Sequence, residues 1–267
     1  MRQEKNSAAI KREAERLDLK IYKLDLHIHT VLSPCSEIAE MTPRAIVRTA
    51  LDRGLDMIAV CDHNSARNAS ATVRAATGSG LTVIPGLEIT SSEEVHVLGL
   101  FPSEAEADAV QEDVYAHLFG ENKEEVFGYQ VVVDEFDYVE DLDQRLLIGA
   151  TTLSTERVVN LIHKFDGLAV ASHVDRPAFG LFSQLGFIPE TVALDALEVS
   201  RHSNFEKVRG TFPQAGSYPL ISSSDAHYLK DIGAVVTLAR MARPSFDELK
   251  LALADREGRA IVEVGAG

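Results

Sequence analysis

Short apolar runs recur along this chain, and stretches with helical spacing of apolar residues separate several of them. An apolar run of roughly four to eight residues is typical of a buried strand, and apolar residues three and four apart are typical of a covering helix. Strands that alternate with helices predict a parallel sheet covered by helices. The number of such units in 267 residues favours a barrel over an open sheet. We expect strands at 21–28, 55–61, 81–84, 95–100, 168–171, 194–199, 218–222, 234–238 and 260–264, and helices at 42–54, 154–165 and 244–254.

Acidic charge is concentrated in one segment of the chain. Between Ser103 and Arg145 there are fourteen acidic residues and two basic ones. Like charges at this density resist burial, so they indicate a solvated insertion. We expect a small inserted acidic lobe or cap at 103–150, containing a hairpin formed by 129–133 and 146–148. The barrel then comprises 21–102 and 151–267, and a polar N-terminal extension occupies 1–20.

The overall composition argues against several classes of protein. The net charge of −15 disfavours unaided binding to nucleic acid or anionic lipid, because that affinity rests on Lys and Arg. The two cysteines, Cys35 and Cys61, are too few for a disulfide framework and suit a reducing cytoplasm. The sequence has no apolar run long enough to span a bilayer, no secretory signal and no glycine-rich phosphate loop. We therefore expect a soluble, cytoplasmic protein without a membrane partner.

Histidines and carboxylates fall at the ends of the predicted strands. His27 and His29 are two residues apart, so both side chains lie on one face of the first strand. In a parallel α/β barrel, functional groups gather at the C-terminal ends of the strands. So many imidazoles and carboxylates at one face predict a bound metal ion. The residues at these positions are Asp25, His27, His29, Asp62, His63, Glu88, His96, His173, Glu198, Asp225 and His227.

The motifs DLHIHT, CDHN, GLE, VHVLG, SHVDRP and SDAH, in this order, resemble those of the polymerase-and-histidinol-phosphatase (PHP) superfamily of metal-dependent phosphoesterases. The resemblance covers about 24–102 and 150–230 and is to the stand-alone bacterial phosphoesterases rather than to domains fused to polymerases. It implies a distorted seven-stranded (β/α) barrel of the PHP type. It also implies a cluster of two or three metal ions at the C-terminal face of that barrel.

The same resemblance implies how the metal ligands are distributed. One metal would be held by His27, His29, Glu88 and Asp225. A second would share Glu88 as a bridge and be completed by His96 and His173. A third would be held by His63 and His227. The mixed nitrogen and oxygen ligands suit two or three divalent transition metal ions, namely zinc, manganese or iron.

Cys35 is a departure from the family pattern. Many family members have another histidine six residues after the first histidine pair, where this chain has Cys35. A thiolate can bind zinc or iron, but Cys35 can equally be an ordinary loop thiol. The third site is therefore expected to be incomplete, weakly held or completed by Cys35.

Hydrolysis of a phosphate ester needs an activated water and positive charge on the phosphate oxygens, and two neighbouring metal ions supply both. A bridging carboxylate binds both ions, so Glu88 is expected to be catalytic, and Asp225 with it. Asp25 and Asp62 stand beside ligand histidines, where a carboxylate can fix an imidazole tautomer; a strand-end cap is the alternative. Glu198 is expected either to support a ligand in the same way or to bind substrate.

Three further residues are candidates for contact with the substrate. Arg176 follows His173 by three residues and is the expected phosphate clamp, because arginine binds phosphate oxygens at two points. A loop ion pair with Asp175 or another acid is the alternative for Arg176. Arg201 and His202 follow a strand end and are expected to bind substrate, with His202 also placed to protonate the leaving group.

These features predict an enzyme, a metal-dependent phosphoesterase that hydrolyses a small phosphate ester through a metal-bridging hydroxide. The expected partner is a small phosphorylated substrate such as a nucleotide or sugar phosphate, and not long nucleic acid. An amidohydrolase is an alternative, because its barrels also begin with two histidines on the first strand. A non-catalytic metal or phosphometabolite sensor and a polymerase-associated exonuclease are further alternatives. The sequence gives no indication of oligomeric state.

Overall fold

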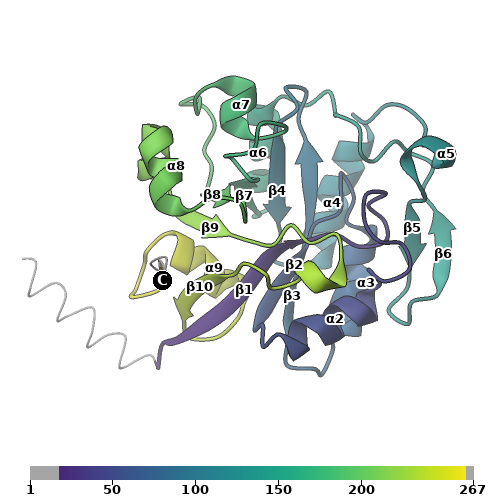
Figure 1. The fold of residues 1–267 in the computed structure, drawn as a ribbon, viewed down its shortest axis with the longest axis horizontal. Helices are drawn as coiled ribbons and strands as arrows, with labels where there is room; N and C mark the ends of the chain where they lie inside the picture. The colour runs from purple at the N-terminus through teal and green to yellow at the C-terminus, as the bar shows by residue number, and fades with distance from the viewer. Residues whose placement is uncertain (1–17, 263–267) are drawn as a thin grey trace, which may run out of the picture.

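A computed structural model of the protein describes residues 18–262. The expected N-terminal extension at 1–20 therefore lies outside the described residues, apart from 18–20. Strands and helices alternate along most of the chain, as the sequence predicts (Figure 1). The strands are β1 Lys20–Ile28, β2 Met57–Val60, β3 Thr82–Thr90, β4 His96–Leu100, β5 Val131–Val133, β6 Val139–Leu142, β7 Leu168–Ala171, β8 Ala196–Val199, β9 Leu220–Ser222, β10 Thr237–Met241 and β11 Ala260–Val262. The helices are α2 Pro43–Asp52, α3 Arg67–Ala75, α4 Glu104–Tyr115, α5 Glu124–Phe127, α6 Thr155–Lys164, α7 Leu181–Leu185, α8 Phe205–Thr211 and α9 Phe246–Leu253, with 3₁₀ turns η1 Pro213–Ser217 and η2 Leu229–Asp231.

Nine of the described strands form one sheet that curls into a nearly closed barrel. Their order is β11-β10-β1-β2-β3-β4-β7-β8-β9. The segment after β9 returns to β1, where Ile28 and Ala226 form a parallel bridge. The α/β class and the barrel-like sheet are thus as predicted. The sheet exceeds the expected seven strands because β10 pairs antiparallel with the outer edge of β1 and β11 pairs with β10.

The sheet is mixed, not parallel throughout as expected. β4 runs antiparallel to both of its neighbours, β3 and β7. The connection from Thr90 to His96 is short, and a short connection can join only antiparallel neighbours. The start of β4 therefore lies beside the end of β3, which places His96 at the face where the parallel strands end.

A β-bulge in β1 decides which side chains face the interior of the barrel. Leu24 and Leu26 belong to the inner apolar cluster, which α9 closes at one end, whereas Ile28 packs in the outer cluster beneath the other helices. The register against β2 shifts between Asp25 and Ile28, so one extra residue lies in β1 there. An extra residue reverses the facing of the positions that follow it. The bulge thereby places His27 and His29 on the inner face, above the leucines.

The acidic segment 103–150 is not wholly a solvated lobe. Helix α4 buries Ala107, Val110 and Val114 in the main outer cluster, and its Gln111 accepts hydrogen bonds from Ser65 Oγ and the backbone of Ala66. Helix α4 therefore covers the sheet as the other helices do, because its apolar stripe outweighs its exposed carboxylates. The hairpin pairs β5 with β6, so 146–148 is not its second strand (Figure 1).

Within the described residues, no helix combines the length and apolar character needed to cross a membrane.

Candidate metal centre

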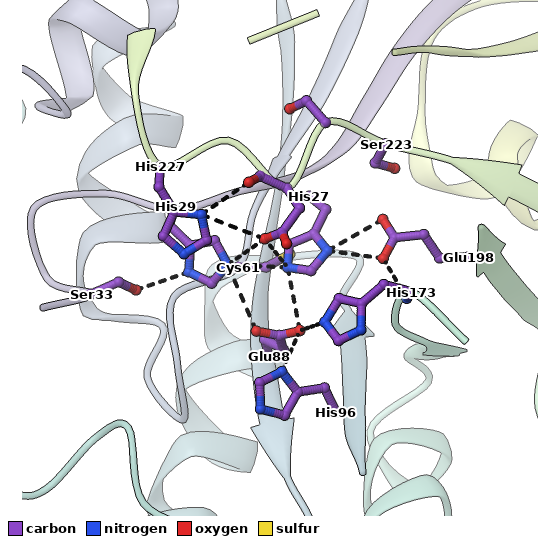
Figure 2. A network of polar contacts seen from close by, with 12 residues as sticks. His27, His29, Ser33, Cys61, Glu88, His96, His173, Glu198, Ser223 and His227 are labelled. Atoms are coloured by element: carbon purple, nitrogen blue, oxygen red, sulfur yellow. Dashed lines mark hydrogen bonds and ion pairs between the residues drawn. The ribbon is translucent and has the colours of Figure 1, made fainter. Parts of the chain in front are cut away.

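The eight predicted metal ligands converge at the end of the barrel where the parallel strands finish. His27 and His29 come from β1, His63 follows β2, Glu88 lies on β3 and His96 begins β4. His173 follows β7, and Asp225 and His227 follow β9. All are buried except Asp225 and His227, which are partly buried. Figure 2 shows the imidazoles arranged around the Glu88 carboxylate.

Glu88 lies at the centre of this group. Its Oε2 is 3.1 Å from His63 Nδ1, and its Oε1 is 2.9 Å from His96 Nδ1. Oε1 is also 3.3 Å from His173 Nε2 and 3.4 Å from His27 Nε2 (Figure 2). The two oxygens therefore face different sets of imidazoles, which is the arrangement that a bridging carboxylate requires.

Asp225 faces the histidine pair on β1 from the neighbouring segment after β9. Its Oδ1 lies 3.2 Å from His29 Nε2 and 3.4 Å from His27 Nε2. Both Asp225 and His173 have left-handed backbones, with φ of 49° and 28°. Such conformations cost free energy in residues other than glycine and cluster at functional sites. They indicate that the surrounding fold holds these two side chains toward the centre.

Hydrogen bonds set the orientation of the two β1 imidazoles. His27 Nδ1 lies 3.0 and 3.2 Å from the two Glu198 oxygens (Figure 2). Ser33 Oγ donates to Asp62, so it accepts a hydrogen bond from His29 Nδ1–H, 2.9 Å away. In the neutral form with Nδ1 protonated, the two rings direct their Nε2 lone pairs toward each other across 3.1 Å. A cation between them would stabilise this arrangement.

The charges of the site favour an ionised Glu88 and divide the ligand imidazoles into two groups. Burial alone would raise the pKa of Glu88, but the imidazoles of His96 and His27 hold it well below its ordinary value. Burial lowers the pKa of His96, and burial together with the neighbouring His227 holds the pKa of His29 well below its usual range. Burial opposes protonation of His27, His63 and His227, but Glu198 raises the pKa of His27 well above its ordinary value, and contacts with Cys35 raise the pKa of His63 and of His227. A neutral imidazole is the form that binds a metal ion.

The donor atoms fit a metal ion. His63 Nδ1, His96 Nδ1 and Glu88 Oε1 are buried and lie close to other polar atoms, but among the described residues none of them forms a hydrogen bond of acceptable geometry. Buried polar atoms normally have hydrogen-bond partners, so these atoms require a partner of another kind, which a metal ion would supply. Three groups of donor atoms each fall within 4.8 Å: His27, His29 and Glu88; His63, Glu88 and His96; and His29, His63 and His227. His63 thus stands between the second and third expected sites instead of belonging to the third alone.

Cys35 lies beside the third group of ligands. Its Sγ is 3.4 Å from His63 Nε2. Burial opposes ionisation of this thiol, but contacts with His227 and His63 outweigh it and lower the pKa of Cys35 to about 6. A thiol with a lowered pKa is partly a thiolate, the form that binds metals. Cys61 instead lies in the inner apolar cluster, as expected of a small buried hydrophobe.

The two aspartates expected to orient histidines differ in what they contact. Asp62 acts through an intermediate, because it accepts from Ser33 Oγ and Ser33 in turn accepts from His29. Asp25 contacts no histidine among the described residues and accepts from the backbones of Ser224 and Gly233 and from Ser224 Oγ. It therefore joins β1 to the segment after β9, which corresponds to the strand-end alternative. Of the three carboxylates expected to support the ligands, Glu198 is the one that contacts a ligand imidazole directly.

The predicted substrate-binding residues are placed at different distances from the centre. Arg176 forms an ion pair with Asp225, not with Asp175, at 2.7 Å between Nη1 and Oδ2. Arg201 pairs with Asp231 at 3.2 Å. The His202 side chain is exposed, and in the described part of the chain it contacts none of the predicted ligands. Arg176 is thus the predicted substrate-binding residue that reaches the metal centre.

Two residues at the site were not anticipated from the sequence. Ser33 supports His29, and Phe179 stacks on His96 with ring centroids 4.4 Å apart. Ser33 follows His29 by four residues in a turn, and Phe179 follows the SHVDRP motif by two. In the sequence, Ser33 and Phe179 are marked only by their positions after a motif. Their contacts are seen only in the folded chain.

Comparison with known proteins identifies relatives of this chain. The family model described as PHP domain matches residues 25–201. An uncharacterised protein of Methanocaldococcus jannaschii, MJ1587, is 33% identical over 89 residues, which are 31% of this chain and 52% of that protein. A 5′-3′ exoribonuclease of Haemophilus influenzae is 31% identical over 81 residues, 29% of this chain and 28% of that protein. The aligned regions thus span about half or less of these relatives.

Solved structures share the fold. The lesion-specific endonuclease PfuEndoQ from Pyrococcus furiosus has a TM-score of 0.69 at 19% identity, over 91% of this chain and 58% of its own. A putative metal-dependent phosphoesterase from Bifidobacterium adolescentis has a TM-score of 0.53 at 22% identity, over 76% and 87%. The family match confirms the resemblance drawn from the motifs and supports the prediction of a hydrolytic enzyme.

One expectation is overturned by these comparisons. Endonuclease Q has also been solved in complex with a 27-mer duplex that carries an abasic lesion at the active site, again with a TM-score of 0.69 to this chain. The expectation of a small substrate and no long nucleic acid is therefore wrong. Net charge was a poor guide because it averages over the molecule, whereas a nucleic acid meets only the charges near its phosphates.

Proposed function

The chain belongs to the PHP domain family, and we propose that it is a metal-dependent phosphoesterase that hydrolyses phosphodiester bonds in nucleic acid. The observation that carries the proposal is the position of Glu88, whose two oxygens lie among buried imidazoles from β1, β4 and the loops after β2 and β7. A hydrolase of this kind needs two metal ions held close together, and this carboxylate is placed to join them.

The residues present define where divalent ions would be held. The first ion would be bound by His27, His29, Glu88 and Asp225. The second would share Glu88 and be completed by His63, His96 and His173. A third would be held by His227 with His29, His63 or Cys35. Zinc, manganese and iron all suit this mixture of nitrogen, oxygen and sulfur donors.

The chain's own residues prepare the site for a phosphate. When bound, neighbouring metal ions lower the pKa of a water molecule and neutralise charge on the phosphate oxygens. Glu198 and Ser33 hold the β1 imidazoles with their Nε2 atoms toward the centre. Arg176 uses Nη1 on Asp225, and its side chain, 33% exposed, retains donors for a phosphate oxygen. We propose Arg176 as the residue that positions the substrate phosphate, with Arg201 and His202 further from the reacting bond.

Nucleic acid is the proposed substrate because of the proteins that share this family or fold. The Haemophilus relative is named as an exoribonuclease, and endonuclease Q acts on a DNA duplex. A phosphodiester between nucleotides is the chemical feature that these two substrates have in common. Free nucleotides and sugar phosphates are therefore controls in the test.

The decisive experiment is a cleavage assay with defined metals. Protein loaded separately with Mn²⁺, Zn²⁺ or Fe²⁺ is incubated with end-labelled single-stranded RNA, single-stranded DNA and duplex DNA containing an abasic site. We expect shortened products with at least one of these substrates, and none with a Glu88→Gln variant. Phosphate release from nucleoside monophosphates alone, or hydrolysis of amide substrates alone, would contradict the proposal.

A further inference from the structure

One compact loop supplies three groups to the metal centre. The segment His173–Gly180, here called the 173–180 loop, connects β7 to α7. It begins with His173 beside Glu88, continues to Arg176 on Asp225 and ends with Phe179 on His96. An imidazole, a guanidinium and an aromatic ring therefore reach the same centre from eight consecutive positions.

The loop is tightly folded on itself. Arg176 N–H donates to the His173 carbonyl at 2.9 Å. A Cβ atom on Gly180 would lie 2.4 Å from the Arg176 carbonyl oxygen and 3.2 Å from that of His173. No larger residue fits at this position without a backbone shift. The close backbone packing at Gly180 therefore fixes the conformation of the loop. The position of Phe179, the residue before it, is fixed with it.

Phe179 is held in an unfavourable backbone conformation. Its φ is 59°, a value that residues with bulky side chains rarely adopt. Its carbonyl accepts a hydrogen bond from His96 N–H at 3.0 Å, which ties the loop to the start of β4. Its ring lies nearly parallel to the His96 imidazole, with 21° between the planes. Strain of this kind persists where the structure keeps a side chain in one place.

Phe179 nevertheless remains accessible. It is 38% exposed, whereas His96, on which it stacks, is 6% exposed. A phenylalanine that served only to cover the imidazole would be stabilised by burial of its own ring as well. Here one side of the ring packs on His96 while a large part of the residue faces solvent next to the metal centre. An accessible aromatic ring beside a phosphate site is the feature with which proteins stack nucleobases.

We infer that Phe179 stacks against a nucleobase of the substrate and so positions the nucleotide next to the metal centre. The inference rests on the proposed function, since only a substrate with bases can use this contact. It names the part of the substrate that the 173–180 loop recognises: Arg176 contacts the phosphate, and Phe179 contacts the base. Stacking accepts any base, so the contact favours nucleotides over other phosphate esters without selecting a sequence.

The test compares matched substrates with and without bases. The probes are a 5′-phosphorylated adenine dinucleotide and its abasic counterpart, which retains the sugars and phosphates. Phe179→Leu keeps an apolar cover over His96 but removes the aromatic face, Phe179→Tyr keeps the face, and Phe187→Leu changes an exposed aromatic beyond α7. We expect Phe179→Leu to weaken use of the dinucleotide about 5- to 150-fold, mainly through KM, and to leave the abasic substrate within about twofold. Phe179→Tyr and Phe187→Leu should resemble the wild type.

Binding of a slowly hydrolysed phosphorothioate form of each probe is measured in parallel, together with metal content. An equal loss on both substrates, or loss of metal in Phe179→Leu, would assign Phe179 a structural role and overturn the inference. Cleavage by the wild type with no effect of Phe179→Leu would overturn the inference and leave the proposed function intact. If the wild type cleaves neither these probes nor the longer substrates of the first assay, the proposed function fails. Equal binding of the base-containing probe by wild type and Phe179→Leu would then overturn the inference as well.

Discussion

Arg176 and Asp225 form an ion pair at the metal centre, with 2.7 Å between Nη1 and Oδ2, while Oδ1 of the same aspartate faces His29. The arginine that the sequence indicates as a phosphate contact is thus also the partner of a proposed metal ligand. Burial would raise the pKa of Asp225, but the charges and hydrogen bonds of His27 and His29 hold it well below its ordinary value. The aspartate is therefore ionised and can interact with a cation and with Arg176 at once.

Substitution of Arg176 should affect both substrate use and metal retention. Charge-assisted hydrogen bonds contribute about 1.5–3 kcal/mol, so Arg176→Ala should lower kcat/KM about ten- to hundred-fold. The loss of the Asp225 partner should also weaken metal binding, measured as metal retained after dialysis. Arg176→Lys keeps the charge without the planar pair of donors, so its kcat/KM should lie between those of the wild type and Arg176→Ala. Unchanged kinetics in Arg176→Ala would remove the phosphate contact and make Arg201 and His202 the next candidates.

Glu88→Gln should lose activity together with most of the bound metal. The amide has one oxygen in place of two, so it cannot join two cations as the carboxylate does, and it leaves buried imidazoles without a counter-charge. Elemental analysis of the purified variant, beside the exposed Glu190→Gln as a control, measures this directly. Wild-type stoichiometry and rate in Glu88→Gln would show that Glu88 is not the bridge.

Glu198→Gln tests the support of His27 without removing a ligand. The Glu198 carboxylate accepts hydrogen bonds from His27 Nδ1 and from the His173 backbone N–H. It therefore fixes both the His27 ring on β1 and the start of the loop after β7. Loss of such a contact typically lowers metal affinity about 10- to 100-fold. A competition titration with a chelating dye gives the affinity, and an affinity within about twofold of the wild type would contradict this role.

Two deletions distinguish the parts of the acidic segment. Replacing Asp134–Tyr138 with an Asn-Gly turn shortens only the partly exposed turn of the hairpin and should leave the thermal midpoint nearly unchanged. Deleting Glu106–Asp143 removes Val110 and Val114 from the main cluster, and each large buried residue contributes roughly 2–5 kcal/mol. That deletion should abolish the cooperative melt. A folded, metal-binding product would show instead that the whole segment is dispensable.

The sequence predicted which candidate ligands lie together better than it predicted the direction of the strands. Strand-end positions and the spacing of His27 and His29 suffice to bring most of the candidate ligands to one face, because parallel strands end together. His96 reaches that face only because β4 runs antiparallel, and β4 was expected to be parallel. The β1 bulge lacks any distinctive residue pattern, since Leu24 to His29 simply alternates.

Contacts between distant segments were beyond what the sequence could indicate. Arg176 meets Asp225, and Asp25 meets Ser224, only after the barrel curls. Similarly, the apolar stripe of α4 was hidden among carboxylates, which dominate the local composition without dominating its packing. Spacing along one element is readable from sequence, whereas pairing between elements depends on the closed fold.

The closure of the barrel at β1 has a consequence for its internal motions. β1 meets the Ser223–His227 segment through few backbone bonds among the described residues, notably His29 N–H to the Ala226 carbonyl, where most neighbouring strands share a ladder. Proposed ligands stand on both sides of this junction, so a bound ion would cross-link it and raise the free energy of local opening. Removal of the metal with a chelator should then accelerate hydrogen exchange of the His29 and Ala226 amides far more than that of the amides that pair β2 with β3. The barrel would respond to metal supply by opening along one line, with its remaining strands still protected.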